Sequence, residues 1–120
     1  MYKGSCLCGE VKYTLKQEPT RASHCHCRMC QKQHGAAFAT YINLHKDDVV
    51  YTHGLDSLLS YHSSGSIVRK FCQHCGSNIE WSSAEQTPDR VAITLCTLDT
   101  PYSPKQIKDI YTDTKVKWLG

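Results

Sequence analysis

Hydrophobic and polar residues alternate along several short stretches of the chain. Val11, Tyr13 and Leu15 are separated by single polar residues, which is the pattern of a strand with one buried face. Comparable β-rich runs, each bounded by Gly, Pro, Asn, Asp or Ser clusters, occupy residues 37–42, 49–52, 58–62, 67–71, 79–81, 91–98 and 107–111. Only residues 28–34 suggest a helix, closed by Gly35, a residue suited to a helix C-terminus. The pattern predicts a mainly β fold of curved antiparallel sheets with one short helix.

The length of 120 residues is usual for one domain and small for two, so we expect a single domain over residues 1–120. Hydrophobic residues make up 40% of the chain, as in a globular protein rather than a disordered one. No apolar stretch reaches the length of a signal peptide or a membrane span, which predicts a cytoplasmic protein without a membrane partner. In a reducing compartment, clustered cysteines are expected to hold metal rather than to form disulfides.

The formal net charge of +3 counts all eight cysteines as neutral thiols. A zinc ion held by four thiolates adds a charge of about −2, and one held by three adds about −1, because the ligating sulfur is deprotonated. The metal-loaded chain would therefore be close to neutral. Since the sequence also has no run of Lys and Arg, we expect no nucleic-acid partner.

Four cysteines lie in two short turns that each lead into a predicted strand. Cys6 and Cys8 form the first pair, and Cys72 and Cys75 form the second, more than sixty residues later. A structural zinc site usually has four ligands in a tetrahedron, supplied as two pairs from two turns. The sequence therefore predicts a structural zinc at these four cysteines that fastens the two turns together.

Three further cysteines, Cys25, Cys27 and Cys30, form a CxCxxC run without an evident fourth ligand. Zinc with three protein ligands and one exchangeable position is the usual form of a catalytic site. We expect a second zinc here, with these three cysteines as the catalytic residues and an open position for a substrate.

A closed second site is the alternative, with Cys96, His24 or His26 as the fourth ligand. We interpret Cys96, which lies between Leu95 and Leu98 in a predicted strand, as a core residue, because free cysteine is among the most buried residue types. Adjacency alone does not make either histidine a ligand. The other histidines are expected on the surface: His34, His45, His53, His62 and His74.

Several motifs recur together over nearly the whole chain: Gly4-Ser5-Cys6-Leu7-Cys8-Gly9 with Val11 and Tyr13, Cys25-His26-Cys27-Arg28-Met29-Cys30 with Gly35 and Phe38, Ser63-Ser64 with Arg69, Phe71-Cys72-Gln73-His74-Cys75-Gly76, and Trp118-Leu119. In this order they resemble the glutathione-dependent formaldehyde-activating family, which includes the centromere protein V type proteins. The resemblance implies an Mss4-like fold of several small antiparallel sheets, with two zinc ions per chain at the two cysteine groups.

The resemblance also implies carbon–sulfur lyase activity, as in members associated with condensing formaldehyde and glutathione to S-hydroxymethylglutathione. The expected partners are a small-molecule thiol and an aldehyde. Two departures bear on glutathione: the chain is compact, and Asp109 stands where relatives often have histidine. Arg28 is a candidate to attract a carboxylate of the thiol.

Two other functions are open at this point. In one, both zinc ions are structural and the protein is a non-catalytic scaffold or a nucleic-acid or chromatin-associated module, with Tyr61 and Arg69 on its surface. In the other, Cys25 and Cys27 serve a zinc store or a thiol-redox sensor. The sequence specifies neither the oligomeric state nor the true substrate.

Overall fold

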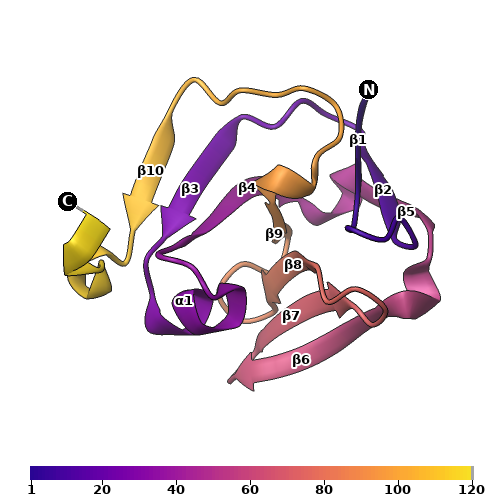
Figure 1. Ribbon diagram of the computed structural model, residues 1–120. Coiled ribbons are helices and arrows are strands. Elements are labelled where there is room, and N and C mark those ends of the chain that lie inside the picture. Colours follow the sequence, from indigo (N-terminus) through magenta and orange to yellow (C-terminus); the bar gives the residue numbers. More distant parts are fainter. Residues whose placement is uncertain (120) are drawn as a thin grey trace.

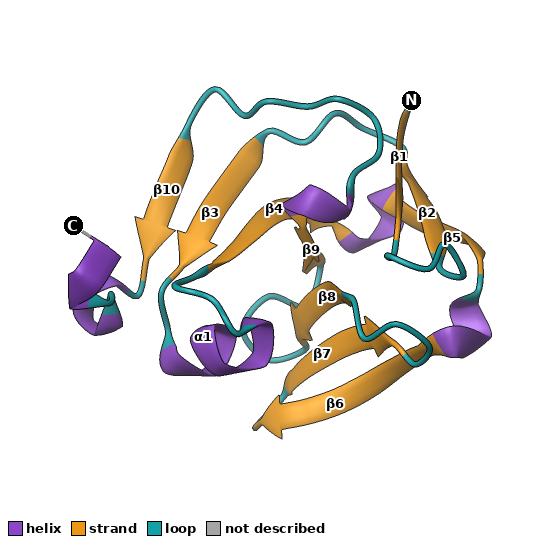
Figure 2. Ribbon diagram, viewed as in Figure 1, coloured by secondary structure: helices purple, strands orange, loops and turns teal. Residues whose placement is uncertain are grey.

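The computed structural model of the chain describes residues 1–119 and is built mostly from strands (Figures 1 and 2). The strands are β1 (Tyr2–Ser5), β2 (Lys12–Leu15), β3 (Arg21–Cys25), β4 (Ala39–His45), β5 (Val49–His53), β6 (Leu58–Ser64), β7 (Ile67–Cys72), β8 (Asn78–Ser83), β9 (Arg90–Thr94) and β10 (Ile107–Ile110). The α-helix is α1 (Arg28–His34), and short 3-10 helices cover Lys46–Asp48, Leu55–Ser57, Leu95–Thr97, Thr112–Thr114 and Lys117–Leu119. The predicted mainly β fold with one short α-helix is confirmed.

The strands form two sheets. A three-stranded sheet has the order β1-β2-β5, and a seven-stranded sheet has the order β10-β3-β4-β9-β8-β7-β6. The larger sheet curves from β10 and β3 on one side of the molecule to β7 and β6 on the other (Figure 1). Its pairs are antiparallel except for β10, which runs parallel to β3 with Ile110 opposite Cys25. The expectation of purely antiparallel sheets was therefore wrong at this edge.

The alternating residues of the second strand point into the core. Val11, Tyr13 and Leu15 are all buried, whereas Lys12 is exposed, as the pattern predicted. They belong to one buried cluster with Ile42 of β4, so the core lies between the two sheets. Burial of each large side chain contributes roughly 2 kcal/mol, which fixes the register of this strand.

Helix α1 begins and ends where the sequence predicted. The Cys27 sulfur caps its N-terminus by accepting a hydrogen bond from the Cys30 amide. Gly35 takes a left-handed conformation, with φ 59°, and its amide donates to the Gln31 carbonyl. Among the described residues, no helix has the length and apolar character needed to cross a membrane.

The segment around Cys96 differs from the prediction. β9 ends at Thr94, and residues Leu95–Thr97 form a 3-10 helix in which Cys96 is exposed. The Thr97 hydroxyl donates to the Thr94 carbonyl, and the Thr94 hydroxyl donates to the Asn78 carbonyl, so the chain turns instead of continuing as a strand. The interpretation of Cys96 as a core residue was wrong. The sequence pattern also missed β1, which pairs with β2.

Candidate metal centres

The four paired cysteines come together in space. Cys6 and Cys8 lie in the turn between β1 and β2, and Cys72 and Cys75 lie at the turn between β7 and β8. All four sulfurs are within 4.8 Å of one another, with 3.6 Å between Cys6 Sγ and Cys8 Sγ and 3.8 Å between Cys8 Sγ and Cys72 Sγ. A tetrahedron with Zn–S bonds of about 2.3 Å separates its sulfurs by about 3.8 Å, so this group fits the predicted ion.

The two turns that carry these cysteines have similar backbone hydrogen bonds. The Gly9 amide donates to the Cys6 carbonyl, and the Gly76 amide donates to the Cys72 carbonyl. Both glycines have positive φ, 80° and 78°, which L-residues with a Cβ adopt only at a cost. The Val11 amide also donates to Cys6 Sγ at 3.2 Å, a contact that stabilises an anionic sulfur. The cluster thus connects the three-stranded sheet to the seven-stranded one.

The CxCxxC cysteines form a second cluster at one end of β3. Cys25 is the last residue of β3, Cys27 caps α1, and Cys30 lies in the first turn of that helix. The sulfurs of Cys25 and Cys27 are 3.5 Å apart, those of Cys25 and Cys30 are 3.2 Å apart, and all three are within 4.8 Å. Three converging thiols of this kind suit a thiophilic metal such as zinc.

No fourth His, Cys, Asp or Glu joins this cluster within residues 1–119. His24 Nδ1 lies 2.9 Å from the Thr40 hydroxyl, and the buried His26 places Nε2 2.7 Å from Asp109 Oδ1. This contact lowers the pKa of Asp109. Cys96 is exposed on its 3-10 helix. The three candidates for a closed second site are therefore not part of the cluster.

Arg69 is the cation beside the second cluster. Its side chain is 3% exposed and donates from Nη1 to Cys30 Sγ at 3.5 Å and to Gln33 Oε1 at 2.9 Å, and from Nε to Ser63 Oγ at 3.2 Å. The hydrogen bond shared with Cys25, together with this guanidinium, lowers the pKa of Cys30 to about 5 although burial opposes the shift. The expectation of Arg69 on an exposed binding surface was wrong.

Arg28 does not take the role expected of it. Its side chain is exposed, donates to Gln31 Oε1 at 2.6 Å and lines a separate hollow with Trp118. His34, expected on the surface, is half-buried, with Nε2 3.2 Å from the Tyr41 hydroxyl. Burial lowers the pKa of His34 and raises that of Tyr41.

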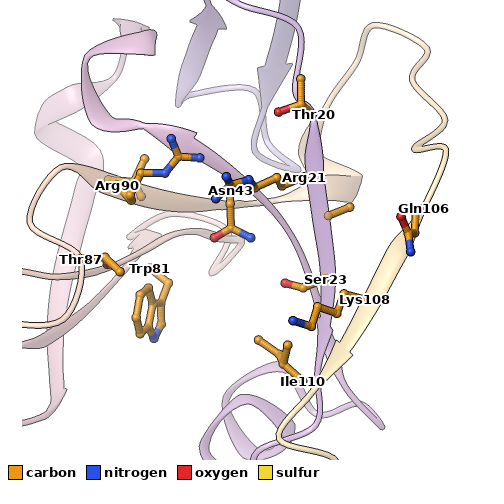
Figure 3. Close-up of a pocket in the computed structure, with 12 residues that line it drawn as sticks. Thr20, Arg21, Ser23, Asn43, Trp81, Thr87, Arg90, Gln106, Lys108 and Ile110 are labelled. Atoms are coloured by element: carbon orange, nitrogen blue, oxygen red, sulfur yellow. The ribbon is translucent and has the colours of Figure 1, made fainter.

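A cavity of about 330 Å³ opens over the three cysteines. Tyr41, Arg69, Trp81 and Ile110 are among its walls, so the aromatic and aliphatic sides come from four different strands of the large sheet. The cavity continues into a second one of about 760 Å³, since residues such as Trp81 and Ile110 line both (Figure 3). The two cavities together are called the groove below. Sequence reasoning missed these walls because they meet only across the folded sheet.

Three comparisons with known proteins bear on this arrangement. The family model described as glutathione-dependent formaldehyde-activating enzyme matches residues 1–114. No curated protein compared with the chain matches it. Among solved structures, a structural-genomics protein from Rhodobacter sphaeroides is similar with a TM-score of 0.71 and 21% identity, covering 89% of this chain and 98% of that one. At this identity the structural match concerns the fold.

Proposed function

Because the chain belongs to the glutathione-dependent formaldehyde-activating family, we propose that it is a zinc-dependent carbon–sulfur lyase that reversibly joins a small-molecule thiol to formaldehyde or another small aldehyde. The observation that carries the proposal is the cluster of Cys25, Cys27 and Cys30, which faces a cavity and has no fourth protein ligand among the described residues. A site with three protein ligands leaves a position for substrate.

The two clusters have different proposed roles. Cys6, Cys8, Cys72 and Cys75 would hold a structural zinc, since four thiols close the coordination tetrahedron. Cys25, Cys27 and Cys30 would hold the second zinc. When bound there, zinc lowers the pKa of a coordinated thiol and polarises a carbonyl group.

The reaction itself is an addition. The sulfur of the thiol forms a bond to the aldehyde carbon while the carbonyl oxygen takes up the proton that the thiol releases, and the lyase direction reverses both changes. Arg69 stabilises negative charge on Cys30 through its N–H···S hydrogen bond. Trp81 and Ile110 line the cavity with apolar surface, which keeps water from the reacting groups.

The burial of Arg69 argues against the non-catalytic nucleic-acid module, because that residue was to supply its surface charge. All eight cysteines are free thiols, which agrees with a reducing compartment, and we propose the cytoplasm as the location.

The decisive variant is Cys27→Ser. Serine is a good N-cap, so the hydrogen bond from the Cys30 amide to the capping side chain can be retained while one metal-binding thiol is lost. Zinc should be counted in the parent and the variant, and thiol–hemithioacetal exchange should be followed for several thiols and aldehydes. We expect two zinc ions in the parent, one in a folded variant, and abolished exchange.

Unchanged exchange in the Cys27→Ser variant would refute the lyase and favour a non-catalytic zinc module. Loss of metal from the three-cysteine cluster on mild oxidation, without exchange activity in the parent, would instead indicate a zinc store or redox sensor.

A further inference from the structure

The part of the groove remote from the cysteines is rich in cations. Arg21, Arg90 and Lys108 line the 760 Å³ cavity, and no acidic residue does. None of the three forms an ion pair with another residue in the range 1–119. In Figure 3, Arg21 and Arg90 extend toward Asn43 from opposite sides, and Lys108 extends from β10 toward Ser23. All three side chains are charged at neutral pH.

The sheet places these cations and the second cysteine cluster on the same face. Side chains two and four residues apart in a strand share a face, so Arg21, Ser23 and Cys25 of β3 all line the groove. Four residues of strand span about 13 Å. In the parallel pair, Lys108 lies opposite Ser23 and therefore between the two ends.

The middle of the groove is less polar than its cationic end. Trp81 and Ile110 line both cavities, opposite each other in the view of Figure 3, and Ala92 lies next to Trp81 in the register of β8 and β9. A ligand that reaches from the cysteines to the cations would pass between these apolar side chains. Its central part is therefore expected to be an uncharged chain rather than a polar one.

We propose that the groove binds an elongated thiol whose end remote from the sulfur carries two or more negative charges, as a phosphate or as a pair of carboxylates. The position of the sulfur rests on the proposed function, whereas the anion site rests on Arg21, Arg90 and Lys108 alone. Arginine forks match both phosphate and carboxylate. Three unpaired cations favour such a ligand over glutathione, whose ammonium group offsets one of its two carboxylates.

The probes are thiols of equal length that differ only at the remote end: 6-mercaptohexyl phosphate, (6-mercaptohexyl)malonate and 6-mercaptohexanol. Binding to the zinc-loaded protein can be followed by the fluorescence of Trp81 in a Trp118→Phe background, since Trp81 lines the groove and Trp118 does not. We expect the better of the two charged thiols to bind about tenfold more tightly than the alcohol, and the phosphate and dicarboxylate arms identify the source of the charge. The short 2-mercaptoethyl phosphate should lose this advantage because it cannot span the groove.

The double variant Arg21→Gln/Lys108→Gln tests the site directly. Its matched control is Lys12→Gln/Lys16→Gln, which removes the same charge from exposed positions outside the groove. The groove variant should bind the charged thiols as weakly as the alcohol, whereas the control should keep the preference. Equal binding of all three hexyl thiols by the parent, or an equal effect of the two double variants, would overturn the proposal.

The two proposals fail in different ways. Preferential binding of a charged thiol without any adduct formation would refute the lyase and leave the anion site standing. Adduct formation that is equally fast with charged and uncharged thiols, with no difference in their affinities, would refute the anion site and leave the lyase standing.

Discussion

The substitution Cys72→Ser tests whether the four-cysteine cluster holds the fold together. Cys72 is fully buried at the end of β7, with its sulfur 3.8 Å from that of Cys8, which is 64 residues away in the chain. Serine is close in size, but its hydroxyl is not deprotonated at neutral pH as a ligating thiolate is. The substitution therefore removes one ligand and little packing.

The expected loss is large compared with the stability of the whole chain. A structural zinc contributes an apparent binding free energy of roughly 10–16 kcal/mol at neutral pH, and only a folded chain presents the four ligands together. The free energy of unfolding of a domain of this size is about 5–15 kcal/mol. Losing even half of the zinc contribution would consume most of that stability. We expect Cys72→Ser to be largely unfolded or aggregated at 25 °C.

Thermal melts by circular dichroism, with the zinc content measured on the same samples, provide the assay. Cys96→Ser is the matched control, because Cys96 is exposed and outside both clusters. It should keep two zinc ions and the parental melting temperature. A cooperative melt of Cys72→Ser within a few degrees of the parent would show that the cluster does not hold the two sheets together.

Three further predictions follow from single contacts. Gly54→Ala should lower the free energy of unfolding by about 3 kcal/mol in urea titrations, because Gly54 has φ 74° and a Cβ there would collide with the Glu10 carbonyl. Arg69→Met should weaken zinc binding at the three-cysteine cluster about tenfold or more in chelator competition, since it removes the hydrogen bond to Cys30 Sγ. Burial raises the pKa of Tyr13 to about 12, so its contribution to stability is complete below pH 10 and should fall by about 2–3 kcal/mol as the pH rises to 12, a loss that Tyr13→Phe should not show.

Each of these has an outcome that would contradict it. Gly65→Ala is the control for Gly54→Ala, because Gly65 also has positive φ but faces open space, and equal losses would exclude the collision as the cause. Unchanged zinc affinity in Arg69→Met would show that the guanidinium does not support the thiolate. An alkaline loss of stability that is the same in Tyr13→Phe as in the parent would assign the effect to other groups.

The sequence predicted the features that depend on local spacing. Alternation placed Val11, Tyr13 and Leu15 in the core because a strand has a two-residue period, and Gly35 marked the end of α1 because few other residues adopt its conformation. The spacing of the cysteines likewise separated them into the groups of four and three that the fold brings together. In each case a few adjacent residues contain the whole signal.

Features that depend on distant contacts were not predictable in this way. The apolar residues around Cys96 resemble a continuing strand, and only the hydrogen bonds of Thr94 and Thr97 show that the chain turns there. The direction of β10 depends on the path of a long connection, which residue composition does not encode. The choice between Arg28 and Arg69 as the cation beside the cysteines required the register of β7 against β8, where Arg69 lies opposite Trp81.

The position of β10 separates two properties of the protein along the chain. This strand is at the edge of the large sheet, pairs only with β3, and contributes Lys108 and Ile110 to the groove but no cysteine to either cluster. Substitutions in this late segment would therefore alter which ligands the groove accepts while the metal-bound framework, encoded by residues 6–75, stays intact. Ligand preference could diverge among relatives by exchange of this one strand, without each change having to preserve the folding of the rest.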